Sequence, residues 1–305
     1  MSRCLRPLFF LLIVRPLALL WLVAFEGAAV VPSLTLLAGY AAYLAIWVVL
    51  IVIASSLAAH ARTALMVLIG IWAFTVILLP RMAPDIALAA NPALTRLETD
   101  IAIVADLRRM GDSHNPDDPY FNAFKQLTLK QYGVDKVEDL PVNYRGLLAV
   151  EGEKLTSKLF DDYADRQFGA QKAQSQLVDA AGVLSPTIAL RRLSKSAAGT
   201  DLEGHRRFLT QAEAYRFAIV QQLNQLQATA ITYDDDSNRN TDPDAGRGVR
   251  IDPENWREVP DFQYAAAATG DKLRAAMPGM ILLLLWLVVL GAGLRFAIRR
   301  LGDAA

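Results

Sequence analysis

The residue patterns of nucleotide-hydrolysing and hydrolytic enzymes are missing from the sequence. No glycine-rich loop ends in Lys-Ser or Lys-Thr, so the common phosphate-binding loop is absent. There is no His-Glu-x-x-His pair for zinc, and no serine stands between glycines at the spacing of a hydrolase elbow. We therefore predict no catalytic residue, no cofactor-binding residue and no metal ligand, in a chain that is not an enzyme.

The remaining metal-ligand types are scattered or badly spaced. His60, His114 and His205 lie in three different surroundings, and we interpret them as isolated side chains. Cys4 is the single cysteine, which excludes an intramolecular disulfide and any zinc site built on two thiolates. The acidic run Asp234–Asp244 lacks the glycine and the glutamate that a calcium loop needs in either register, which favours a solvated loop over a calcium site.

Two charges, Arg15 and Glu26, interrupt the first apolar run. Charges within a membrane span are costly and often functional. In a helix these two residues share a face but lie about 16 Å apart along the axis, so they cannot pair directly. One interpretation gives them a transport role. The other, which we favour, has Arg15 extending to the inner interface and Glu26 to the outer one.

The chain contains apolar runs that are long enough for membrane helices. A bilayer core of about 30 Å needs about 20 apolar residues in a helix, because only helices satisfy the backbone there. The runs predict four spans, which cover residues 8–31, 34–54, 64–79 and 275–294. The third is expected to end at Pro80 and Arg81. The first run is open to other readings, as an interfacial piece with a short span or as a cleaved signal peptide.

The charge distribution predicts the orientation. Net charge is zero, but acidic residues exceed basic ones in the long segment after the third span, and basic residues exceed acidic ones elsewhere. Arginines mark the N-terminus, the link between the second and third spans, and the C-terminus, so the positive-inside rule places these in the cytoplasm. We predict a transmembrane region at 1–83, an extracytoplasmic helical domain at 84–274, and a last span with a cytoplasmic tail at 275–305. No basic tract of the kind that binds nucleic acid is present.

The short link Ser55–Thr63 between two spans is the strongest candidate for contact with a partner. It carries Ala58, Ala59, His60 and Arg62. A push on this link would reach both helices, whereas a push on a loose tail would not. The alternative is a plain hairpin connection without a further role.

The segment 84–274 shows helix start and stop signals. We expect a helix from Asn91-Pro92 to Met110, one from Tyr120 to a stop at Gly133, and a long one from Tyr144 to Ala181. Ser185-Pro186 starts another helix, which ends at Gly199.

The last long helix of this segment is expected to begin with a capping box of Thr200 and Glu203. Its apolar residues recur at helical spacing and predict one buried stripe. That stripe consists of Phe208, Ala212, Tyr215, Ile219, Leu223 and Leu226. The polar stretch Asp234–Arg250 is predicted to be a loop.

Several stretches resemble one bacterial family. They are YGVDKVEDLPVNYRG (132–146), LSPTIALRRLSKSAAGTDLEGHRRFLTQAEAYRFAIVQQLN (184–224), WREVPDFQY (256–264) and SSLAAHARTALMVLIGIW (55–72). The family is that of the ABC-2-type transporter permeases with a large extracytoplasmic domain of unknown function. Its members are distant relatives of the permease used in copper-site maturation of nitrous oxide reductase. Members usually have a further N-terminal half, so this chain looks like a short form.

The resemblance implies a membrane-spanning permease subunit of an ABC-type export system in a bacterial cytoplasmic membrane. A separate ABC ATPase would supply the energy, and a second permease subunit would complete a homo- or heterodimer. The alternative is a membrane sensor or scaffold whose outer domain binds a ligand or a protein. An ATPase encoded beside the gene would favour the first hypothesis. The link residues Ala58, Ala59, His60 and Arg62 are the predicted ATPase-coupling site.

Overall fold

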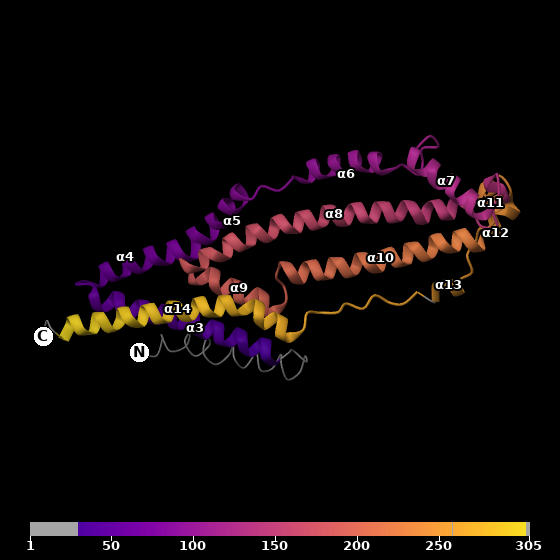
Figure 1. Ribbon diagram of the computed structural model, residues 1–305. Coiled ribbons are helices and arrows are strands. Elements are labelled where there is room, and N and C mark those ends of the chain that lie inside the picture. Colours follow the sequence, from indigo (N-terminus) through magenta and orange to yellow (C-terminus); the bar gives the residue numbers. More distant parts are fainter. Residues whose placement is uncertain (1–29, 258, 303–305) are drawn as a thin grey trace. The chain divides into compact units, whose positions relative to one another are not determined.

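The computed structural model describes residues 30–257 and 259–302, which form helices and no strand, so the predicted all-α class is confirmed. Figure 1 shows the course of the chain through these helices. The chain divides into two compact units. The first, which we call the membrane unit, comprises residues 1–92, 170–207 and 266–305, and the second, the polar unit, comprises residues 93–169 and 208–265.

The membrane unit contains the three described helices that are long and apolar enough to cross a membrane. They cover Val30–Leu57, Ala61–Ala90 and Thr269–Arg299, and contain the predicted spans 64–79 and 275–294 as well as 34–54. The predicted first span, 8–31, lies almost entirely outside the described residues. The elements of the unit are α3 (Val30–Leu57), α4 (Ala61–Trp72), the π-helix η2 (Ala73–Leu78), α5 (Leu79–Ala90), the 3-10 turn η4 (Ala181–Val183), α9 (Pro186–Ala198) and α14 (Thr269–Gly302).

The helix does not end at Pro80 and Arg81, where the third span was expected to close, because α4, η2 and α5 form one unbroken helix. The π-helix explains why. The N–H of Leu79 donates to the carbonyl of Phe74, five residues back, and Pro80 has no N–H. The carbonyl of Thr75 therefore has neither of its usual donors. The hydroxyl of Ser185 donates to this carbonyl instead, at 2.6 Å, and the helix continues to Ala90.

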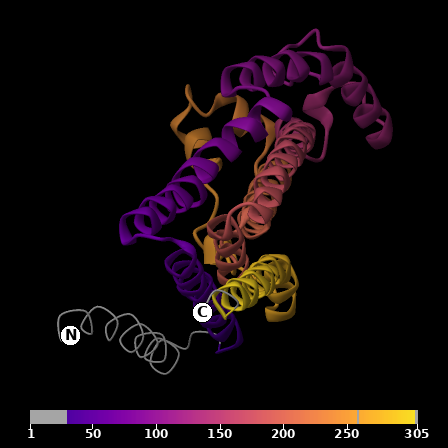
Figure 2. The same cartoon turned by 90° about the vertical axis from the view of Figure 1, so that its left-hand side faces the viewer.

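The helices α3, α9 and α14 pack into one apolar core, and Figure 2 shows them side by side. Ile46 of α3, Leu193 of α9 and Leu283 of α14 are completely buried in it. Two glycines permit the close approach. A methyl group at Gly39 would lie 2.7 Å from the side chain of Leu193, and one at Gly279 would lie 2.8 Å from the backbone of α9. The segment 170–207, expected to belong to the outer domain, thus packs with the membrane helices.

The polar unit consists of helices joined by short turns. Its elements are α6 (Arg96–Met110), α7 (Pro119–Tyr132), the 3-10 turn η3 (Val137–Asp139), most of α8 (Tyr144–Ala180), most of α10 (Leu202–Ala230), α11 (Tyr233–Asn238), α12 (Pro243–Gly248) and α13 (Glu254–Arg257). Most predicted helix ends are confirmed. Helices end before Gly111, Gly133 and Gly199, each with a positive φ that suits glycine, and Ser185 caps α9.

Two predicted helix starts are wrong, and in both cases a neighbouring residue makes the better cap. Asn91 ends α5, and α6 instead begins after Thr95, which forms a full capping box with Glu98. Helix α10 begins after Asp201 rather than Thr200. The carboxylate of Asp201 accepts the N–H of Gly204 at 3.0 Å, whereas the hydroxyl of Thr200 turns back to the carbonyl of Lys195.

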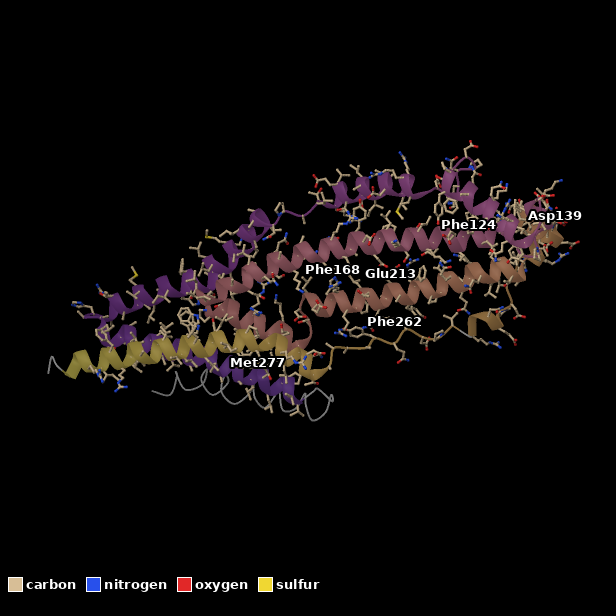
Figure 3. The ribbon with its side chains drawn as sticks, viewed as in Figure 1. Phe124, Asp139, Phe168, Glu213, Phe262 and Met277 are labelled. Atoms are coloured by element: carbon tan, nitrogen blue, oxygen red, sulfur yellow. The ribbon has the colours of Figure 1, made fainter. Side chains whose placement is uncertain are left out.

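Side-chain hydrogen bonds hold α8 and α10 together in the polar unit. The amide groups of Gln221 and Asn224 donate to backbone carbonyls of α8, at 3.0 and 3.2 Å. Glu213 extends from α10 toward α8 (Figure 3). Its carboxylate accepts a hydrogen bond from the hydroxyl of Ser157 in α8 and another from the guanidinium of Arg216 in α10. Gly146 of α8 has no room for a side chain, since a methyl group there would lie 2.3 Å from the backbone of Ala228.

The predicted apolar stripe of α10 is not buried. Ala228 is the one buried residue of this helix, and Phe208, the first residue of the stripe, is 44% exposed. The extended segment 260–265 runs beside the stripe instead. Phe262 makes ring contacts with Phe208 and Tyr215 (Figure 3), and Gln211 exchanges two hydrogen bonds with the backbone of Ala265. An extended chain covers a helix face less completely than a second helix does.

The acidic stretch Asp234–Arg250, predicted to be a loop, forms α11 and α12. Asp236 is only 2% exposed. Its carboxylate accepts hydrogen bonds from Asn143 at 3.1 Å and Gln227 at 3.0 Å, and it pairs with Arg239. It therefore joins the start of α8, the end of α10 and α11. The sequence contains no local sign that this aspartate, out of three in a row, is the buried one.

Candidate functional site

The link between α3 and α4 is shorter and more regular than predicted. Only Ala58, Ala59 and His60 separate the two helices. The N–H of Ala58 donates to the carbonyl of Ala54 at 3.1 Å, which extends the last turn of α3. His60 is extended and is the N-cap residue of α4, and its carbonyl accepts the N–H groups of Thr63 and Ala64. The backbone alone therefore fixes this turn.

The polar side chains of the link are free for an external partner. His60 and Arg62 are exposed, and within the described part of the chain neither side chain makes a hydrogen bond or an ion pair. Arg62 lies in the first turn of α4, where the helix dipole disfavours a cation. Local helix stability thus does not explain an arginine at this position. The positive-inside rule accounts for it, and an anionic partner surface would also suit it.

The link lies at one end of two long helices. The helix of 30 residues that starts at Ala61 continues through η2 to Ala90, which at 1.5 Å per residue gives about 45 Å. A displacement of the link would therefore move one continuous helix and not several helices joined by flexible loops. Of the predicted coupling residues, Ala58, Ala59 and His60 form this turn and Arg62 lies in the first turn of α4.

A set of polar contacts ties the same helix and its neighbours to the segment around α9. Ser185, besides capping α9, holds the π-helix through Thr75. The hydroxyl groups of Tyr43 and Thr187 lie 3.2 Å apart, joining α3 to α9. The indole of Trp286 donates to the carbonyl of Gly182 at 3.4 Å, joining α14 to η4. These contacts were not predicted, because each one joins residues more than 100 positions apart.

Two further charged candidates come from the first predicted span. Arg15 and Glu26 lie outside the described residues. Within residues 30–257 and 259–302, no group of three or more His, Cys, Asp or Glu side chains is arranged to hold a metal ion.

Comparison with known proteins gives the family. Residues 96–265 match the family model described as a domain of unknown function (DUF3526). The match covers more than half of the chain, so the chain belongs to this family. It includes the polar unit from residue 96 onward and the segment that carries α9. No curated protein and no solved structure matches the chain.

Proposed function

We propose that this chain is a permease subunit of an ABC-2-like export system, energised by a separate ATPase. The observation that carries the proposal is the link Ala58–His60. Ala59 and His60 of this link are exposed, Arg62 just after it has no partner among the described residues, and the helix that begins at Ala61 continues to Ala90. A membrane helix of this kind can carry a displacement across the bilayer.

The energy source follows from the same reasoning. The sequence has no nucleotide-binding loop, so in an ABC-type transport cycle a partner would hydrolyse the ATP. An ATPase acts from the cytoplasm, where the positive-inside rule puts the link. The proposal therefore includes an ABC ATPase at the link and a second permease subunit, identical or not, in the bilayer of a bacterial cytoplasmic membrane.

The coupling role of the link is tested by reversing its charge. The chain is reconstituted in vesicles with the ATPase that co-purifies from native membranes. Arg62→Glu is expected to lower vesicle-stimulated ATP hydrolysis about tenfold, since it puts like charges in contact. Arg96→Glu, at an exposed position of α6 outside the apolar helices, is the matched control and should change little. A photo-crosslinker at His60 should attach to the ATPase.

Full ATPase activity of Arg62→Glu would mean that the coupling surface lies elsewhere. Hydrolysis of ATP by the purified chain alone would contradict the permease-subunit proposal. If no ATPase co-purifies and none crosslinks, the sensor or scaffold hypothesis becomes the better one.

The proposed orientation has both termini in the cytoplasm and residues 84–274 outside. Single cysteines at Ser113, Asn238 and Gly302 of a Cys4→Ser variant would report it by reaction with an impermeant thiol reagent. In intact spheroplasts Ser113 and Asn238 should react and Gly302 should not. Labelling of Gly302 alone would reverse the orientation and move the link away from any cytoplasmic partner.

A further inference from the structure

A cavity of about 280 Å³ lies in the membrane unit between α5, the end of α8 and α9. Its lining has two kinds of side chain. Pro84, Ala87 and Leu88 of α5 contribute an apolar wall, with Val178 and Ile188 beside them. The remaining lining is polar or charged and consists of Gln174, Ser175, Asp179, Arg191 and Lys195.

The charges around the cavity do not balance. Arg192 pairs with Asp179, the one carboxylate of the lining, at 3.5 Å. Burial raises the pKa of Asp179, although the three cations of α9 oppose that shift. Nearby Asp201 is engaged as the cap of α10 and accepts the hydroxyl of Ser196. Arg191 and Lys195 therefore face the cavity without an ion pair to any described carboxylate.

Helix α9 brings these cations beside the apolar part of a membrane helix. At 100° per residue, its core face with Ala189 and Leu193 lies roughly opposite the face with Arg191 and Lys195. The core face packs against α14 at Ala276, Gly279 and Leu283, inside the run 275–294 that is apolar enough to lie in the bilayer. An unpaired cation next to hydrocarbon is costly unless it reaches an anion or water.

We propose that this cavity binds the phosphate headgroup of an anionic phospholipid, with Arg191 and Lys195 on the phosphate and an acyl chain along Pro84, Ala87 and Leu88. The bilayer itself supplies a ligand that has both parts, and guanidinium and ammonium groups are the usual partners of phosphate. A soluble phosphate would satisfy the cations but would leave the apolar wall uncovered. The inference does not depend on coupling to an ATPase.

The test uses the full chain in a neutral detergent with three probes. They are dihexanoyl phosphatidylglycerol below its micelle concentration, dihexanoyl phosphatidylcholine, and inorganic phosphate, with binding read by native mass spectrometry. Phosphatidylglycerol should bind best and inorganic phosphate should not bind. The double variant Arg191→Gln/Lys195→Gln should weaken phosphatidylglycerol binding about tenfold, because two charge-assisted contacts are lost.

Two further variants distinguish loss of the binding site from a change in net charge and from misfolding. Lys158→Gln/Lys172→Gln removes two exposed cations outside the cavity and should leave binding unchanged. Leu88→Trp changes no charge, starts from a side chain that is 54% exposed, and should reduce phosphatidylglycerol binding by filling the apolar wall.

Three outcomes would overturn the proposal. Undiminished lipid binding by the Arg191→Gln/Lys195→Gln protein would show that the cavity is not the site. Equal loss in the Lys158→Gln/Lys172→Gln control would show that only net charge matters. Inorganic phosphate that binds as well as the lipid, and is lost in the double variant, would mean that the site serves a soluble anion and not a lipid.

Discussion

The contacts that stabilise the membrane unit internally differ from those that stabilise the polar unit. In the membrane unit, Leu193 and Leu283 are completely buried and glycines let the helices approach closely. In the polar unit, α10 has one buried residue, and amide and carboxylate groups join it to α8. Hydrocarbon removes the hydrophobic driving force between membrane helices, so close packing of small residues replaces it. In water, polar contacts are weak individually but specify which residues face one another.

The comparison predicts that added volume will damage the membrane unit most. Gly279→Leu should prevent α9 from packing on α14, because even its first carbon would lie 2.8 Å from backbone atoms of α9. We expect a loss above about 3 kcal/mol, at the upper end for overpacking, which should abolish amide-exchange protection in α9. Gly291→Leu, where nothing lies within 4 Å, is the control and should keep that protection. Equal behaviour of the two variants would contradict the packing argument.

The polar unit also contains a close contact between two helices at a glycine, which sharpens the comparison. Gly146→Ala should cost about 2–3 kcal/mol, since the new methyl group would lie 2.3 Å from the backbone of Ala228. Gly169→Ala, with open space around it, should instead stabilise α8 by about 1 kcal/mol. Amide exchange in α10 measures the first effect and exchange in α8 the second. If Gly146→Ala is harmless, the two helices do not meet at this point.

Removing a buried polar group should affect only the polar unit. Asp236→Ala should cost about 2 kcal/mol, because Asn143 and Gln227 lose their shared acceptor in a buried position. Exchange should increase at the start of α8 and the end of α10 and stay unchanged in α9. Asp234→Ala, at an exposed position of the same helix, is the matched control. A change that spreads to α9 would mean that the units are not independent.

A smaller effect is expected at the π-helix. Ser185→Ala should cost about 1–2 kcal/mol, since it removes the cap of α9 and leaves the carbonyl of Thr75 without a donor. Ser185→Thr keeps the hydroxyl and should recover most of the loss. Exchange of the amides in residues 73–79 and 186–189 reports both ends of the contact. Normal protection in Ser185→Ala would show that water or another group satisfies Thr75.

The smallest effect concerns the corner between α6 and α7. Hydrogen bonds from the backbone N–H groups of Asp112 and Phe121 lower the pKa of Asp118 below its ordinary value of 3.8. A lowered pKa means stability that is present above 3.8 and lost as the pH falls through the folded value. The protection factor of the Phe121 amide should therefore fall only in strongly acidic solution. Asp118→Asn should remove this dependence, and an unchanged acid response would assign it to another group.

Local sequence signals predicted much of the helical framework. Long apolar runs located three spans, and the glycines at 111, 133 and 199 located helix ends, because these properties depend on residues a few positions apart. The cap of α9 at Ser185 followed from the same rules. The link Ala58–His60 was also found this way, although its helices begin and end closer to it than expected.

Only the tertiary structure decided which distant residues those elements contact. Nothing near Pro80 in the sequence indicates that Ser185 will satisfy Thr75 and keep the helix continuous. The burial of Asp236 depends on Asn143, 93 positions away. The place of α9 depends on Gly39 and Gly279, which give it room against two spans. A helical period shows that one face is apolar or charged, but the partner of that face is set by packing between distant segments, and so the cavity beside Arg191 and Lys195 exists only in the folded chain.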